Sequence, residues 1–360
     1  MKIGIVTQSL SQNYGGIVQN YALQQVLKRL GHEPITIDYR IKMPFWLWVL
    51  CILKTMLLYF IPGKIKKFPP LPKIKPRKDK IAQFVDAHIN LTKEVSVYKK
   101  ELINKYQLNG LIVGSDQVWR PISNKYCLYD CYLRFAKSEN IVKVAYAASF
   151  GVDFWEYSSK QTKRCKDLAK QFSAMSVREQ SGVTLCEQYL GCKAIEVLDP
   201  TLLLSAQDYS YLCEQVPRYN EPFLAAYILD MDEDKRKTVE SYASFLHLSV
   251  RFVTAGDNLS LSVSEWLALF RDASFVVTDS FHGTVFSIIN RKDFVSINNK
   301  GRGASRFESL LSKFDLNSRL IGKYEDIEDL SPIDWIHVDE RKTEWINLSV
   351  DFLRESLHGE

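Results

Sequence analysis

Residues 274–289 read SFVVTDSFHGTVFSII and contain the pattern on which the rest of the chain is built. The β-branched run at the start of this stretch is typical of a buried strand, and the apolar run at its end predicts a helix. The polar turn between them holds Asp279, Ser280 and His282. A turn of this kind lies at the carboxyl edge of a sheet, where open α/β sheets bind ligands and a helix N-terminus favours an anion.

His282 has two readings at this position. A histidine at the ligand-binding edge of a sheet can exchange a proton near neutral pH. It can also do no more than cap the helix or fill a polar hole. The spacing of the stretch alone favours neither reading.

The same strand, turn and helix pattern opens the chain. Residues 2–7 predict a buried strand, residues 17–30 a helix with apolar residues at helical intervals, and residues 34–39 a second strand. This βαβ order predicts a parallel sheet. The first turn contains Asn13, Tyr14 and two glycines, but it is not a GxGxxG sequence and is weak as a dinucleotide fingerprint.

Further strands that end in polar turns follow before residue 205. Because the carboxyl ends of parallel strands meet at one edge of a sheet, these turns are expected to line one cleft. The residues concerned are Asn13 and Tyr14 in the first turn, Gly114, Ser115, Asp116 and Gln117 after the strand near residue 110, and Arg178 after the strand near residue 174.

The chain is long enough for two domains. Residues 215–222 read as a linker, and a second α/β unit begins at Phe223. We predict an α/β protein with two doubly wound Rossmann-like domains, at residues 1–214 and 215–335, a cleft between them, and a C-terminal helix within residues 336–360. A glycine-rich basic loop with Lys300 and Arg302 precedes a helix that contains Arg306.

Composition is that of an ordinary globular protein, with 46% hydrophobic and 25% charged residues and a net charge of only +5. The seven cysteines form no CxxC pair, so we expect free thiols in a reducing compartment and no bound metal. The sequence starts directly with a strand and has no signal peptide pattern, so we expect a cytoplasmic protein.

One segment departs from this pattern. Residues 43–62 read MPFWLWVLCILKTMLLYFIP, and residues 64–80 hold eight Lys or Arg against one Asp. An apolar aromatic helix followed by a polybasic tract favours a peripheral dock on an anionic membrane surface. A buried helical hairpin with a solvated loop, a transmembrane span and a nucleic-acid site are the alternatives.

The predicted cleft is rich in cations, which suits a small dianionic substrate with a proton to move. These groups are Arg178, His282, Lys300, Arg302 and Arg306. A solvated basic loop is the alternative for the cations. No HExxH, P-loop or nucleophile elbow occurs, and Ser280 lies too close in sequence to His282 to indicate a nucleophile pair.

Five segments together resemble the polysaccharide pyruvyl transferase family. They are NYGGIVQNYALQQVLKRLG from residue 13, VGSDQVW from 113, SVRE from 176, DPTLLL from 199, and TDSFHGTVFSI from 278 with the later SRFESLL. The resemblance implies a two-domain fold similar to GT-B glycosyltransferases. It also implies transfer of a pyruvyl group from phosphoenolpyruvate to two hydroxyls of a sugar, with phosphoenolpyruvate as co-substrate and no cofactor.

The resemblance implies roles for individual residues. Arg178 of the SVRE segment is expected to bind phosphoenolpyruvate, and His282 is expected to be the general acid. Some members carry an arginine where this chain has Ser280, so we expect the second anion contact to come from Lys300, Arg302 or Arg306. Gly114, Ser115 and Ser280 are expected beside the donor.

The remaining expectations concern the acceptor and the base. Asp116 or Asp279 would act as base, and Asn13, Tyr14 and Gln117 would contact the sugar. A lipid-linked sugar at the inner face of the cytoplasmic membrane would explain a membrane dock within residues 43–80, and no nucleic acid is expected as a partner. Two other functions stay open: a GT-B glycosyltransferase that uses a nucleotide sugar, and a non-catalytic glycan-binding or membrane-binding relative.

Overall fold

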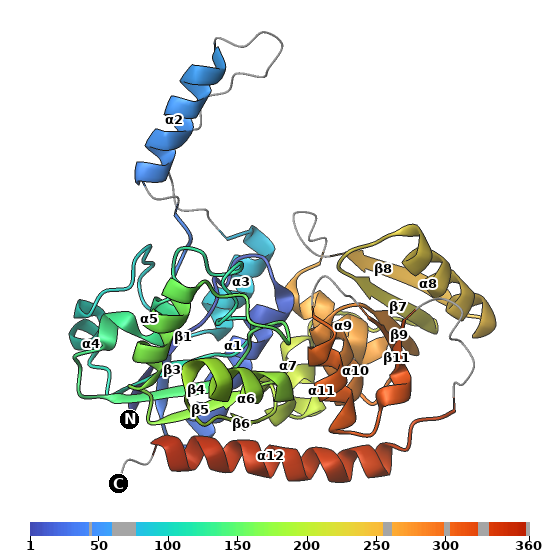
Figure 1. The fold of residues 1–360 in the computed structure, drawn as a ribbon. Coiled ribbons are helices and arrows are strands. Elements are labelled where there is room, and N and C mark those ends of the chain that lie inside the picture. Colours follow the sequence, from blue (N-terminus) through green and yellow to red (C-terminus); the bar gives the residue numbers. More distant parts are fainter. Residues whose placement is uncertain (43–44, 60–76, 255–260, 299–302, 323–330, 358–360) are drawn as a thin grey trace.

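The structure is a computed structural model that describes residues 1–42, 45–59, 77–254, 261–298, 303–322 and 331–357. Two parallel sheets lie side by side, each with helices packed on it, as Figure 1 shows. The prediction of two doubly wound Rossmann-like domains is confirmed.

The first sheet has six parallel strands in the order β2-β1-β3-β4-β5-β6. Its strands are β1 (Lys2–Val6), β2 (Glu33–Thr36), β3 (Gly110–Val113), β4 (Val142–Ala148), β5 (Ala174–Val177) and β6 (Ile195–Glu196). The helices of this half are α1 (Tyr14–Arg29), α2 (Phe45–Tyr59), α3 (Asp79–His88), α4 (Glu101–Tyr106), α5 (Ser159–Ala169), α6 (Gln180–Leu185) and α7 (Ala206–Leu212). Short helical turns include η4 (Pro200–Leu203).

The second sheet has five parallel strands in the order β11-β10-β9-β7-β8. Its strands are β7 (Phe223–Ile228), β8 (Ser249–Thr254), β9 (Phe275–Thr278), β10 (Asp293–Ile297) and β11 (Leu320–Ile321). The helices are α8 (Glu233–Phe245), α9 (Val263–Asp272), α10 (Phe281–Ile289), α11 (Ser305–Ser312) and α12 (Trp335–Leu357). Residues 274–289 therefore contain strand β9, a turn and helix α10. Strand β9 lies in the centre of its sheet.

Helix α1 begins three residues earlier than the apolar periodicity predicts. Its first turn contains Tyr14, Gly15 and Gly16, and all three are buried. Glycine has a low intrinsic helix propensity, so the sequence predicts a turn here. Packing of this turn against the second domain overrides that preference.

The two domains share one apolar core. A single cluster of buried side chains includes Ile3 from β1 and Phe223 from β7. At the centre of the interface, Tyr14 of α1 stacks on Trp266 of α9 with ring centroids 5.4 Å apart, and Trp266 also meets Phe286 edge to face at 5.0 Å. The interface is thus a continuous aromatic core and not a loose contact.

Helix α12 runs beneath both sheets in Figure 1. Its Ser349 hydroxyl accepts a hydrogen bond from the Leu198 amide of the first domain at 2.9 Å, and its Leu353 is fully buried. Near its start, the His337 ring lies 2.8 Å from the Asp315 carboxylate of the second domain. The helix therefore ties the two domains together.

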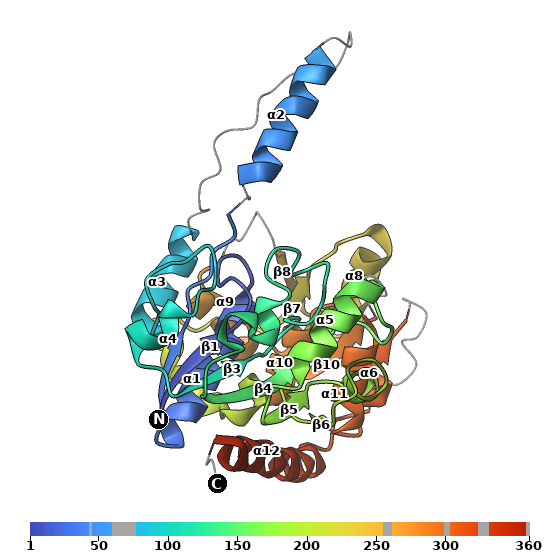
Figure 2. The same cartoon turned by 60° about the vertical axis from the view of Figure 1, so that its left-hand side comes forward.

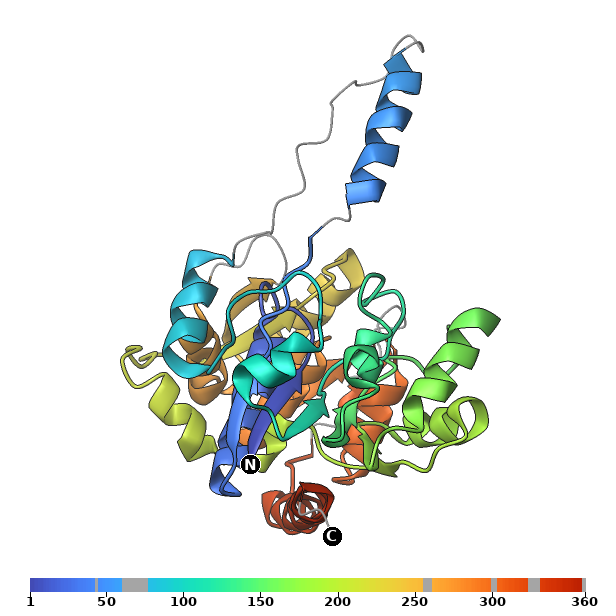
Figure 3. The ribbon, with the colours of Figure 1, turned by 90° about the vertical axis from the view of Figure 1, so that its left-hand side faces the viewer.

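Helix α2 projects away from both domains in Figures 1, 2 and 3. None of its described side chains is buried, and Leu53 and Leu57 are 50% and 72% exposed. A buried hairpin is therefore wrong for residues 45–59. Within the described ranges, no helix combines the length and the apolar character that a membrane crossing requires.

Candidate active site

A cavity of about 340 Å³ lies between the two domains, where the turn after β3, the start of α1 and the start of α10 converge. Its lining combines polar and charged side chains with a few apolar ones. They are Gln8, Gln12, Asn13, Asp116, Gln117, Ser123, Leu229, Asp279, Ser280, Phe281, His282 and Arg306. Six of the predicted site residues are thus brought to one cavity together with Arg306, which comes from α11.

His282 lies in the first turn of α10, where the β9 strand ends. Ser280 is the N-cap of this helix, and its hydroxyl oxygen accepts a hydrogen bond from the Gly283 amide at 3.3 Å. The capping role therefore belongs to Ser280 and not to His282. The imidazole is nearly buried, and its Nε2 lies 3.7 Å from the Asp199 carboxylate.

Asp116 follows β3 and faces the cavity. Its Oδ2 accepts a hydrogen bond from Asn13 at 3.4 Å, and its Oδ1 lies 3.4 Å from the Arg178 guanidinium. Asp116 has a φ of +68°, a left-handed conformation that is uncommon for a residue with a side chain. Such outliers concentrate at functional sites, where the surrounding structure imposes them.

Arg178 lies behind the cavity and not in its lining. Its side chain is only 2% exposed, and its Nη1 donates to Asp199 at 2.8 Å. The Phe281 ring covers the guanidinium at 4.1 Å. The expected contact of Arg178 with phosphoenolpyruvate stays a prediction, and in this structure Arg178 pairs with the carboxylates of Asp116, Glu179 and Asp199.

Among the Lys and Arg residues that the structure describes, Arg306 lines the cavity. When the Gln117 amide is turned so that its oxygen faces Arg306, it accepts hydrogen bonds from Nη1 and Nη2 at 2.9 and 3.2 Å. Burial, followed by repulsion from Arg178, lowers the pKa of Arg306 to about 10. A negatively charged ligand beside Arg306 would relieve both effects.

Asp279 is held by three donors. Its carboxylate accepts hydrogen bonds from the Leu229 amide at 2.6 Å and the Asp230 amide at 3.2 Å, and it pairs with Lys235 at 2.7 Å. These bonds join the turn after β7 to the turn after β9. The geometry favours a structural role for Asp279 and leaves Asp116 as the better candidate for the base.

Three other predicted residues lie outside the cavity lining. Tyr14 is buried in the domain interface, where its hydroxyl donates to the Leu261 carbonyl at 2.6 Å. Burial raises the pKa of Tyr14 to about 12. Ser115 is fully buried, and its hydroxyl donates a hydrogen bond to the Asp199 carboxylate at 3.2 Å. Gly114 has a φ of +136°, and a Cβ at this position would overlap the Tyr146 carbonyl oxygen. The sequence pattern therefore predicts that these residues lie near the cleft, but their side chains do not line the cavity.

Two sequence predictions fall on Lys300 and Arg302, which lie outside the described residues. Conversely, sequence reasoning did not single out Asp199. Asp199 follows a predicted strand in the same way as Asp116, so the strand-end pattern could have identified it. Gln12 and Phe281 belong to turns that were expected at the cleft, and both line the cavity.

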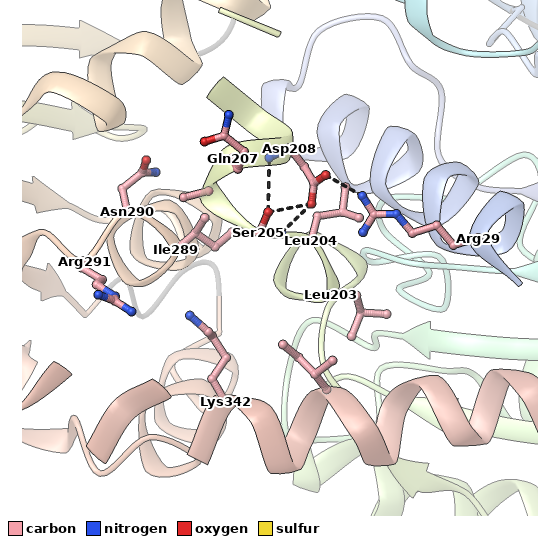
Figure 4. Close-up of a pocket in the computed structure, with 12 residues that line it drawn as sticks. Arg29, Leu203, Leu204, Ser205, Gln207, Asp208, Ile289, Asn290, Arg291 and Lys342 are labelled. Carbon is pink, nitrogen blue, oxygen red and sulfur yellow. Dashed lines mark hydrogen bonds and ion pairs between the residues drawn. The ribbon is translucent and has the colours of Figure 1, made fainter. Parts of the chain in front are cut away.

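A second cavity, of about 780 Å³, lies at the C-terminal end of α10, between α7, α12 and the end of α1 (Figure 4). Asp208 there accepts from Arg29 at 2.5 Å and closes a capping box with Ser205. Arg291 and Lys342 both pair with Asp339 of α12. Because its charges already pair with one another and no candidate catalytic side chain lines it, this cavity is not the candidate active site.

In the described part of the chain, no three His, Cys, Asp or Glu side chains are grouped so that they could hold a metal ion. The cavity instead presents a cation, a carboxylate and a histidine within one polar enclosure. Such a set can bind an anion and move a proton.

The comparisons with known proteins agree with this description. The sequence model of a family described as polysaccharide pyruvyl transferase matches residues 13–301. Among solved structures, UDP-GlcNAc 2-epimerase from Neisseria meningitidis is similar with a TM-score of 0.51 at 8% identity, over 100% of this chain and 95% of that one. UDP-GlcNAc 2-epimerase from Methanocaldococcus jannaschii has a TM-score of 0.46 at 10% identity, over 100% and 94%. A search of curated proteins found no match. At these identities, the first structure supports the two-domain GT-B-like fold alone.

Proposed function

This chain belongs to the polysaccharide pyruvyl transferase family, and we propose that it transfers a pyruvyl group from phosphoenolpyruvate to two hydroxyls of a sugar. The products are a cyclic ketal on the sugar and free phosphate. The observation that carries the proposal is the placement of His282, Asp116 and Arg306 around one interdomain cavity. An acid, a base and an anion-binding group are what this reaction needs.

The reaction begins with proton transfer to the donor. His282, as imidazolium, protonates the methylene carbon of the enol, and a sugar hydroxyl attacks the cation that forms. Asp116 takes the proton of that hydroxyl. Loss of phosphate and attack by the second hydroxyl then close the ketal.

Arg306 holds the anionic donor during these steps. Arg306 supplies the positive charge that an arginine at residue 280 would otherwise provide, because its guanidinium lines the same cavity from α11. The fixed positive charge stabilises negative charge on the departing phosphate as it develops, without reorganisation of solvent. Asn13 and Gln117 line the same cavity and are the proposed contacts of the sugar.

The test is turnover with phosphoenolpyruvate and a panel of lipid-linked sugars, read by phosphate release and by the mass gain of the acceptor. His282→Ala should lose about 10²–10⁴-fold in kcat, the usual contribution of a general acid. His337→Ala is the matched control, since that histidine is half exposed and pairs with Asp315 away from the cavity. Near-normal turnover by His282→Ala would remove the acid assignment.

The same assay separates the two other functions. Nucleotide release from a nucleotide sugar, with no phosphate release from phosphoenolpyruvate, would identify a GT-B glycosyltransferase. Absence of both activities, together with glycan or membrane binding, would identify a non-catalytic relative.

We further propose that α2 docks the protein on an anionic membrane surface, where a lipid-linked acceptor would be found. Phe45, Leu53, Met56 and Leu57 of this projecting helix are each at least half exposed. Exposed apolar area of this kind is unfavourable in water, by about 25 cal/mol per Å². Lys54 is the only charge on the helix, and the polybasic tract that follows lies mostly outside the described residues.

Sedimentation with lipid vesicles tests the dock. The full chain should bind anionic vesicles more strongly than zwitterionic ones, and salt should weaken the binding. Leu53→Glu/Leu57→Glu should abolish it. Ile336→Glu is the control, because Ile336 is 76% exposed on α12, away from α2. Unchanged binding by the double variant would refute the dock.

A further inference from the structure

Asp199 is a fully buried carboxylate that neither lines the cavity nor faces solvent. Its Oδ1 accepts hydrogen bonds from the Thr201 hydroxyl at 2.6 Å and the Thr201 amide at 3.0 Å. Its Oδ2 accepts from Arg178 Nη1 at 2.8 Å and from the Ser115 hydroxyl at 3.2 Å. Four donors therefore fix this carboxylate in one orientation.

The same Oδ2 atom faces His282. The imidazole Nε2 lies 3.7 Å from it, is shielded from solvent and makes no hydrogen bond to any described residue. His282 comes from α10 of the second domain, whereas Asp199 follows β6 of the first. One carboxylate oxygen thus joins the candidate acid to Arg178 across the domain boundary.

The His282 ring also packs against Gly15 in the first turn of α1. A Cβ at Gly15 would overlap the imidazole, with Nδ1 as the nearest ring atom. At the neighbouring Gly16 a Cβ would come no closer than 3.4 Å to any atom, which is ordinary contact. Gly15 is therefore the position where only a glycine leaves room for the ring.

Electrostatics agree with this geometry. Burial would raise the pKa of Asp199, but His282, Arg178 and Thr201 together hold it well below the usual range of an aspartate. Asp116 and Glu179 face Arg178 on its other sides. Asp199 therefore stays ionised and available as an acceptor for an imidazole N–H.

We propose that Asp199 is a positioning residue that accepts the Nε2–H of His282, so that Nδ1 is the atom that transfers the proton in the reaction. A neutral imidazole carries one N–H, and the group that accepts it decides which nitrogen stays bare. With Nε2–H directed at Asp199, Nδ1 is left to gain and lose the catalytic proton.

The chemical part of this inference rests on the proposed function. Proton transfer breaks the Nδ1–H bond and forms a C–H bond at the methylene carbon of phosphoenolpyruvate. The two sugar hydroxyls release two protons as they add. One of them passes from Asp116 to His282 and replaces the proton now in the new methyl group, and the other leaves with phosphate, so His282 ends each cycle protonated again.

The direct test is the tautomer of His282 in the full-length wild-type protein. Nitrogen-15 labelled histidine, with His282→Gln to assign the signal, shows which ring nitrogen carries the proton once the ring is neutral. We expect Nε2–H and a bare Nδ1. An Nδ1–H tautomer would overturn the proposal, whatever the activity of the enzyme.

Variants give a second readout. Asp199→Asn should weaken or reverse the tautomer preference and lower kcat by about 10²-fold or more, since the wrong tautomer alone can cost 10⁴-fold in a comparable histidine–aspartate pair. Thr201→Val is the control, because it removes a bond to the other oxygen of Asp199 and should keep the wild-type tautomer. If Asp199→Asn keeps both tautomer and kcat, the proposal is wrong.

The Gly15 contact provides an independent pair of variants. Gly15→Ala should displace the ring and lower kcat at least tenfold, whereas Gly16→Ala should stay within a few fold of wild type. Equal activities for the two variants would contradict the packing argument. If the wild type releases no phosphate from phosphoenolpyruvate, the proposed function fails, but the tautomer measurement still decides whether Asp199 orients His282.

Discussion

Arg306 shows how a binding site lowers the stability of the protein that contains it. Burial and the nearby Arg178 lower its pKa to about 10, so its charged form is disfavoured in the folded protein relative to the unfolded chain. A cation whose folded pKa is depressed reduces stability at neutral pH, and this reduction fades as the pH rises through the folded pKa. Asp116 and Glu179 offset only part of this effect, and an anionic ligand beside Arg306 would offset more of it.

We therefore predict that Arg306→Gln raises Tm at pH 7 by a few degrees, with a smaller gain above pH 10. The same variant should lose the increase in Tm that phosphoenolpyruvate gives the wild type, because binding to the folded state stabilises it. Thermal unfolding with and without phosphoenolpyruvate measures both effects. Arg354→Gln, on the exposed side of α12, should change neither; an Arg306→Gln variant that keeps the ligand-induced shift would contradict the assignment.

The two cavity aspartates are predicted to respond in opposite ways to substitution. Asp279→Asn removes the negative charge that pairs with Lys235 and accepts hydrogen bonds from two backbone amides. It should therefore lower the free energy of unfolding by about 1–3 kcal/mol. Asp116→Asn should mainly lower kcat. Urea unfolding and steady-state kinetics on both variants separate the roles. A larger kcat loss in Asp279→Asn would exchange the assignments.

Residues also show how far the sequence could predict the site. The strand-end pattern correctly brought His282, Asp116 and Gln117 to one cavity, because parallel strands share an edge. It could not show that Asp279 is held by Leu229 and Lys235, since those partners come from another strand and helix. The close approach of Gly15 to His282 is likewise a contact between domains, which no local pattern encodes.

At the scale of elements, the start of α10 explains what Ser280 does. The sequence comparison had marked Ser280 as a position where an arginine was missing. In the structure it caps the helix that carries His282, with its hydroxyl on the Gly283 amide. A cap satisfies one of the free N–H groups of the first turn and holds the entry of the chain into the helix.

Ser280→Ala should therefore lower the free energy of unfolding by about 1 kcal/mol, with the usual range for a lost cap of about 0.5–2 kcal/mol. Chemical denaturation measures this loss. Ser280→Gly should cost less, since glycine is tolerated at N-caps. If alanine and glycine leave stability equal to wild type, the cap contributes nothing and another role must be sought for Ser280.

Element boundaries were predictable where apolar periodicity was strong and unpredictable elsewhere. Strand β7 begins at Phe223, where the second α/β unit was predicted to begin, and β9 and α10 form the strand and helix predicted within residues 274–289. Strand β11 has only two residues and pairs with the end of β10, so the sequence offers no run long enough to detect it. Helix α1 begins early because its glycines are stabilised by packing, which local propensity does not include.

At the scale of the molecule, the shared aromatic core makes the two domains one cooperative unit. Domains that meet through small polar interfaces move relative to each other, whereas a large apolar interface restrains such motion. The stack of Tyr14 on Trp266 joins helices of different domains at the centre of a continuous core. The cleft is therefore held by packing between the two domains.

We predict one unfolding transition for the chain, seen at the same urea concentration by fluorescence and by far-ultraviolet circular dichroism. Trp266→Ala should lower the free energy of unfolding by about 3–5 kcal/mol, as for other large aromatic truncations in a core. Phe245→Ala is the control, because Phe245 is 65% exposed on α8. Two separate transitions in the wild type would show that the domains unfold independently.

Helix α12 has a consequence for the order of events during synthesis. Its Ser349 completes the hydrogen bonding of Leu198, a residue 151 positions earlier in the chain, and its Phe352 packs near Tyr146 of β4. The first domain therefore leaves the ribosome long before the helix that seals it has been made. Until α12 emerges, part of an apolar sheet is uncovered, and a nascent chain in that state is a natural client for a chaperone.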